Sequence, residues 1–172
     1  MASLMENLIE TLEKECMEYE GLLELSQKKT PVIIKGDLEE LQKITDEEQD
    51  YASRITNLEK KRSVVYADIA NVINRDVDTL KLDDLITMLE NRPAERNALA
   101  EIHDRLKSAV RGLQRVNEQN KELLTNALEM VEFEMNLVQA MKAAPETANY
   151  NKGAYSAGSS MGVTPGSFDA KQ

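Results

Sequence analysis

The sequence has no tryptophan, and phenylalanine and tyrosine together make up only 4% of its 172 residues. Compact globular cores usually rely on large aromatic side chains, so leucine, isoleucine, valine, methionine and alanine must supply the buried volume here. Only four prolines and seven glycines are present, which leaves long segments without a helix-breaking residue. These shortages favour a fold in which helices pack on helices.

Cysteine and histidine occur once each, as Cys16 and His103. A single cysteine excludes an internal disulfide and is typical of a reducing compartment. Cys16 lies on an apolar helix face, so we expect buried packing rather than a nucleophile. His103 has no partner for a zinc site or for a second catalytic base, and we expect it to point to solvent. Since the chain also has no phosphate-binding glycine loop, we predict no enzyme activity, no metal and no cofactor.

The sequence has fewer basic residues than acidic ones, 21 against 31, so its net charge is −10. This balance argues against nucleic acid, whose phosphates require lysine and arginine, and against an anionic membrane surface. No segment approaches the roughly 18 apolar residues of a membrane-spanning helix, so we expect no membrane insertion. The first ten residues lack the basic and apolar regions of a signal peptide. We therefore expect a cytoplasmic protein.

Apolar residues recur in alternating steps of three and four along most of the chain, which is the spacing of a coiled coil. Pro31 is expected to kink or interrupt the first helix, and Gly36 to turn it into an antiparallel hairpin with the second. The predicted fold is all-α, an elongated antiparallel coiled coil or helical bundle of three main helices plus a short connecting helix. We expect this bundle at 1–144, with a flexible Gly/Ser-rich tail at 145–172. The predicted helices are 3–34, 38–74, 83–91 and 93–143.

Four polar residues occupy positions of the apolar seam, namely Glu48, Arg62, Asn120 and Glu134. Polar seam residues can set the register and pairing of helices in a bundle. We expect that role for Arg62 and Asn120, whereas it is less clear for Glu48 and Glu134.

The end of the long helix is more apolar than one seam requires. Its polar residues Glu129, Glu132, Asn136 and Gln139 form one narrow strip, and nearly all others between 127 and 141 are apolar. The long helix also exceeds its antiparallel neighbour by about 13 residues, or roughly 20 Å, which leaves this end uncovered. Exposed apolar surface marks a contact site. We predict that a partner binds at Leu123, Leu124, Leu128, Met130, Val131, Phe133, Met135, Leu137, Val138 and Met141.

Alternatives to partner binding stay open for this end of the long helix. The helix can bend back, or the tail together with Ile33 and Ile34 can cover the surface. The same face also suits homodimerisation. The tail contains Tyr150, Tyr155 and Phe168, which a pure spacer would not need, so we expect it to become ordered on binding.

Three groups of residues, taken in order, resemble a known family over nearly the whole chain. They are Leu22-Leu23 with the Gly36-Asp37 break and Leu41, Leu58, Glu59 and Arg62; then Asn117, Asn120, Leu123 and Leu124; then Asn149-Tyr150-Asn151-Lys152-Gly153. The last group resembles the Tyr-x-x-Gly motif in the tail of the FlgN family of flagellar export chaperones. The Gly/Ser tail ending in Phe168 is longer than expected for that family.

The resemblance implies a cytoplasmic chaperone of flagellar type III export. Such a protein binds the C-terminal helices of the hook–filament junction proteins FlgK and FlgL, prevents their premature assembly and delivers them to the export apparatus. The resemblance also implies contacts with the export gate FlhA and the export ATPase complex, with Tyr150, and Tyr155 as a second residue, docking at the gate. Helix-in-groove binding would suit this role. The alternative is a structural coiled-coil scaffold or tethering protein that acts by self-association.

Overall fold

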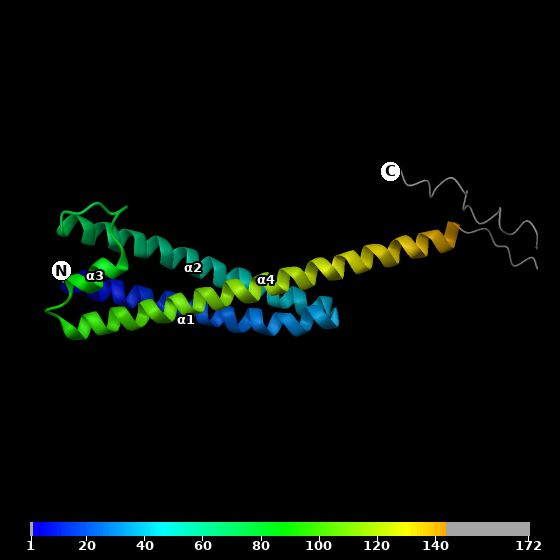
Figure 1. The fold of residues 1–172 in the computed structure, drawn as a ribbon, viewed down its shortest axis with the longest axis horizontal. Helices are drawn as coiled ribbons and strands as arrows, with labels where there is room; N and C mark the ends of the chain where they lie inside the picture. The colour runs from blue at the N-terminus through cyan, green and yellow to red at the C-terminus, as the bar shows by residue number, and fades with distance from the viewer. Residues whose placement is uncertain (1, 144–172) are drawn as a thin grey trace, which may run out of the picture. The chain divides into compact units, whose positions relative to one another are not determined.

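The computed structural model describes residues 2–143, and these form helices without any strand. The helices follow one another in the order α1 (Ala2–Lys35), α2 (Leu38–Val72), α3 (Leu82–Met88) and α4 (Pro93–Ala143), as Figure 1 shows. The prediction of an all-α bundle with one short connecting helix is confirmed. The predicted flexible tail lies outside the described residues.

The chain divides into two units, residues 1–124 and 125–172, with the division inside α4. The first unit contains α1, α2, α3 and the first part of α4. The described part of the second unit is the remainder of α4, up to residue 143. Along residues 2–143, no helix is both long enough and apolar enough to cross a membrane.

A glycine turn joins α1 to α2. Gly36 has a φ of +70°, and its backbone N–H donates to the carbonyl oxygen of Val32 at 3.1 Å, which ends α1. Asp37 then caps α2, because its Oδ1 accepts a hydrogen bond from the backbone N–H of Glu40 at 3.1 Å. The turn is short, so α1 and α2 pack side by side in opposite directions, as predicted (Figure 1).

We expected Pro31 to kink or interrupt α1; it does not interrupt the helix, and a kink there stays a prediction. The helix continues through Pro31 to Lys35. An interior proline removes one backbone hydrogen bond, and its ring crowds the carbonyl group of the preceding turn. Ile33 is buried beyond Pro31, and Thr30 before it bonds to Asn120 of α4, so packing on both sides retains the helical path.

A hydrophobic core of the first unit lies where the start of α1, the end of α2, the connection with α3 and the start of α4 meet. Leu80 and Leu85 bring the connection into this core, and Leu82 packs against its edge. The connection therefore closes this end of the helical bundle. The core residues are Met5, Leu8, Leu12, Val65, Ile69, Ala70, Leu80, Leu85, Leu89, Leu99 and Ile102.

Polar seam residues join the helices further along. Arg62 of α2 donates from Nη1 to Oε1 of Glu15 in α1 at 2.9 Å. Glu48 accepts from Lys29 Nζ at 2.8 Å, so it also pairs α2 with α1. Asn120 of α4 donates a hydrogen bond from Nδ2 to the backbone carbonyl oxygen of Ser26 in α1. All three positions are therefore interhelical contacts. Glu134 lies in the second unit and is exposed.

Candidate functional site

The part of α4 in the second unit carries a concentrated set of exposed apolar side chains. Eight of the ten residues predicted to bind a partner lie there, and their exposed fractions range from 49% to 69%. They are Leu128, Met130, Val131, Phe133, Met135, Leu137, Val138 and Met141. We call this set the apolar end of α4. Exposed apolar surface of this extent on one helix is typical of a protein contact.

The apolar end is helical for local reasons. Its leucine, methionine, alanine and glutamate residues all have high helix propensity. The segment also extends an existing helix, so it avoids the costly nucleation step. Lys142 in the last turn is favourable beside the helix C-terminus. The sequence therefore forms this helix without needing to bury its apolar side chains.

At 100° per residue, the apolar residues cover well over half of the helix circumference, and the polar strip that contains Asn136 covers the rest. Glu134 lies near the middle of the apolar arc. A partner helix packed on either side of Glu134 would meet a row of large apolar side chains. Burying one such side chain contributes roughly 1.5–3 kcal/mol, and several such contacts together are needed to offset the entropy that two molecules lose on association.

The remaining predicted residues have different surroundings. Leu123 and Leu124 are half-buried and belong to the first unit, so they are not part of the apolar end. A role for them in binding stays a prediction. Tyr150 and Tyr155 lie outside the described residues, and their docking role likewise stays a prediction.

Cys16 is completely buried in α1, as predicted. Its thiol donates to Oε1 of Glu20 at 3.5 Å. Burial, together with the nearby Glu20 carboxylate, raises the pKa of the thiol from 9.0 to about 11. The thiolate needed for nucleophilic chemistry is therefore strongly disfavoured at this position.

His103 does not point freely into solvent, which corrects our expectation. Its side chain is only 26% exposed. Nδ1 lies 3.2 Å from Oδ1 of Asp104, and Nε2 lies 3.7 Å from Oδ1 of Asp83. Asp83 belongs to α3, so the folded-back connection covers a face of α4 that sequence spacing alone assigned to solvent. Across residues 2–143 no group of three or more histidine, cysteine, aspartate or glutamate side chains is placed to hold a metal.

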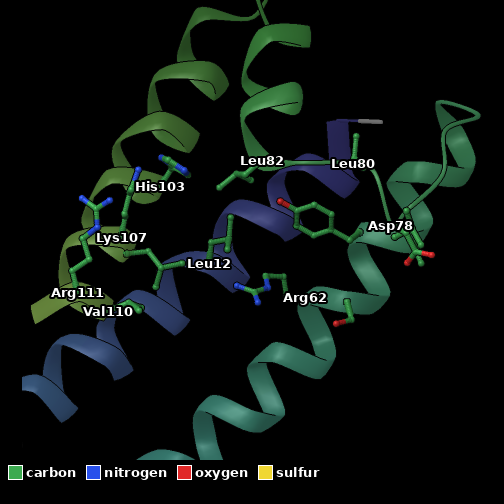
Figure 2. Close-up of a pocket in the computed structure, with 14 residues that line it drawn as sticks. Leu12, Arg62, Asp78, Leu80, Leu82, His103, Lys107, Val110 and Arg111 are labelled. Atoms are coloured by element: carbon green, nitrogen blue, oxygen red, sulfur yellow. The ribbon is translucent and has the colours of Figure 1, made fainter. Parts of the chain in front are cut away.

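A groove in the first unit, which the sequence did not indicate, has a volume of about 810 Å³. Figure 2 shows Leu12 of α1 at its floor, α4 on one side and Arg62 of α2 on the other, with Leu80 and Leu82 of the connection near one end. We call this the α2–α4 groove. Its lining residues are Leu12, Arg62, Ser63, Tyr66, Ala67, Val77, Asp78, Leu80, Leu82, His103, Leu106, Lys107, Val110 and Arg111.

Comparison with known proteins places this helical chain in a family. The model of the FlgN protein family matches residues 1–156. Over 145 residues the chain is 26% identical to the uncharacterized protein YvyG of Bacillus subtilis (strain 168). The matched region covers 84% of this chain and 83% of that protein. No solved structure matches the chain at a significant level. Because the family match spans far more than half of the sequence, the chain belongs to the FlgN family of flagellar export chaperones.

Proposed function

We propose that this flagellar export chaperone works in the cytoplasm and binds the C-terminal helices of the hook–filament junction proteins FlgK and FlgL. It prevents premature assembly of these subunits and delivers them to the export apparatus. Membership of the FlgN family, which is not a family of enzymes, supports the general role. The observation that carries the proposed binding site is the apolar end of α4, with its eight exposed large side chains.

The proposed mechanism is packing of helix against helix. An unassembled junction subunit has amphipathic terminal helices whose apolar faces are buried only in the filament. The apolar end of α4 offers such a helix a temporary partner of the same kind. Three methionines, Met130, Met135 and Met141, supply adaptable contact surface, which suits the binding of more than one subunit. Occupying the subunit's apolar face would block its assembly.

The proposed delivery step uses a different part of the chain. Tyr150, with Tyr155 as a second residue, would dock at the export gate FlhA, and other contacts would reach the export ATPase complex. Both tyrosines follow the apolar end in sequence. Substrate and gate could therefore be held at the same time.

The test is binding of the full chain to a C-terminal fragment of FlgK or FlgL by isothermal titration calorimetry. Leu137→Glu combined with Met141→Glu should weaken the 1:1 complex by at least roughly a hundredfold, because two buried apolar contacts are replaced by charges. The matched control is Asn136→Glu with Gln139→Glu, which adds the same charge to the polar strip and should bind normally. Circular dichroism should show unchanged helicity in both variants. Normal binding by the Leu137/Met141 variant would place the site elsewhere.

The alternative function is a scaffold that acts by self-association, and the same exposed face favours it. Sedimentation velocity of the free chain separates the two functions. A chaperone should be monomeric or weakly dimeric. A lasting oligomer that Leu137→Glu with Met141→Glu converts to monomer would support the scaffold instead.

A further inference from the structure

The residues that line the α2–α4 groove carry a positive charge, whereas the chain as a whole is acidic. The whole chain carries a net charge of −10. Among the groove's lining residues, Lys107 and Arg111 are basic and Asp78 is the sole acidic one, while the third basic residue, Arg62, is paired with Glu15. A groove with more basic than acidic lining residues on an acidic protein can select an acidic ligand.

The basic side chains of α4 are regularly spaced. Lys107, Arg111 and Arg115 follow one another at intervals of four residues, so they lie along one face of the helix about 6 Å apart in axial rise. All three are exposed. In contrast to Arg105, which forms an ion pair with Glu20, they have no hydrogen bond or ion pair with any residue of 2–143.

The floor and walls beside this row are apolar. Leu12, Leu106 and Val110 line the groove next to Lys107 and Arg111, and Tyr66 lines it from α2. Figure 2 shows Lys107, Val110 and Arg111 together on α4, across the groove from Arg62. Arg62 keeps its bond to Glu15, so the α2 side of the groove is held in place by α1.

We infer that the α2–α4 groove binds an acidic amphipathic helix of a partner protein. An apolar stripe on that helix would cover Leu12, Leu106 and Val110, and glutamates spaced four residues apart would pair with Lys107 and Arg111. A helix laid between α2 and α4 over α1 would add a fourth member to the bundle, a stable packing arrangement. This surface is separate in sequence from the apolar end of α4, and its argument does not depend on the proposed function.

Charge favours an acidic helix of a partner protein over two other occupants, which are the chain's own tail and a second copy of the chain. Residues 145–172 contain two acidic and two basic residues and so sum to zero, which gives the chain's own tail no match to the basic row. A second copy of the chain would bring a further net charge of −10. Repulsion between the two acidic chains outside the groove would oppose their association. A long polyanion would meet the same repulsion beyond the groove.

The experiment measures binding of a fluorescently labelled synthetic helical peptide to the full chain by anisotropy. The peptide has leucines at helical spacing and glutamates at every fourth position, and a control peptide has lysine in place of each glutamate. Lys107→Glu with Arg111→Glu should weaken binding of the acidic peptide about tenfold or more, since two attractive pairs become repulsive. Lys60→Glu with Lys61→Glu, which makes the same charge change on exposed residues outside the groove lining, should alter affinity less than about twofold.

A second measurement locates the peptide. Binding should survive Leu137→Glu with Met141→Glu, and backbone NMR shifts should change at Tyr66 and Val110. This result would stand even if FlgK and FlgL failed to bind. The inference is overturned if the groove and control variants bind the acidic peptide equally, if the lysine peptide binds as well, or if the Leu137/Met141 variant loses binding. It is also overturned if a peptide of residues 145–172 displaces the acidic peptide at equal concentration, or if the chain dimerises through the groove.

Discussion

The side-chain amide of Asn120 in α4 donates a hydrogen bond from Nδ2 to the backbone carbonyl oxygen of Ser26 in α1, across 2.9 Å. Both residues are buried. The other end of the amide is also used, because Oδ1 accepts a hydrogen bond from Thr30 Oγ1 at 2.6 Å. The two bonds join residues that are 94 and 90 positions apart in sequence, so they set the register of α4 against α1.

Replacing Asn120 with alanine should lower the free energy of unfolding by about 1–3 kcal/mol, because a buried hydrogen-bonded amide is lost and Thr30 loses its partner. Urea denaturation followed by circular dichroism measures this change. Asn117→Ala is the matched control, since Asn117 is exposed on the same helix. Alanine has a higher helix propensity than asparagine, so Asn117→Ala should not lower the free energy of unfolding. Equal changes in the two variants would contradict a stabilising role for the interhelical bonds.

Glu15 should make stability depend on pH. Its side chain is buried, Oε1 accepts from Arg62, and Oε2 has no hydrogen-bond partner within residues 2–143. Burial raises the pKa of this carboxyl above its ordinary value, although Arg62 opposes the rise. The folded state therefore holds the proton more tightly than the unfolded state does. Its contribution to stability is complete below the unfolded pKa, near 4.3, and is lost as pH rises through the folded pKa.

Glu15→Gln removes this titration. The free energy of unfolding of the variant, minus that of the natural chain, should increase as pH is raised from 4 to 7, because only the natural chain must bury a charge. Urea unfolding at several pH values measures the difference. The exposed Glu13→Gln serves as a control and should give a flatter difference. Parallel pH profiles for the Glu15 variant and the natural chain would contradict the proposed cost of ionising Glu15.

Cys16 should resist alkylation in the folded protein. It is fully buried, and its pKa of about 11 leaves roughly a hundredfold less thiolate at pH 8 than a cysteine of pKa 9.0 would have. Incubation with iodoacetamide, followed by mass spectrometry, should show labelling only as fast as the structure opens. In denaturant the same thiol should react with iodoacetamide at the rate of an exposed cysteine. Rapid labelling of the folded chain would show that this part of α1 is accessible.

Gly36 is required for its backbone conformation rather than for space. Its φ is +70°, and an added Cβ would meet no atom within 4 Å. Gly36→Ala should therefore lower the free energy of unfolding by about 1–2 kcal/mol through backbone strain alone. Gly36→Asn should cost less, because asparagine adopts positive φ more readily. If alanine were tolerated as well as asparagine in thermal unfolding, the turn would have another conformation available.

Sequence by itself determined the helices and much of their faces. The spacing of three and four residues indicated α1, α2 and α4, the Gly36-Asp37 pair indicated the turn, and the seam position of Cys16 indicated its burial. The apolar composition beyond residue 127 also indicated exposed side chains such as Phe133, which is 63% exposed. These features are local, because helix period, capping and turn chemistry depend on residues a few positions apart.

Only the tertiary structure decided which faces meet. It brought Glu15 to Arg62 and Asn120 to Ser26, folded α3 over His103, and kept α1 helical through Pro31. It also placed Tyr66 and Lys107 on opposite sides of one groove. Residues far apart in sequence meet according to the register and packing of whole helices. The spacing of apolar residues in the sequence indicates which face of each helix is apolar, but not which helix packs against that face.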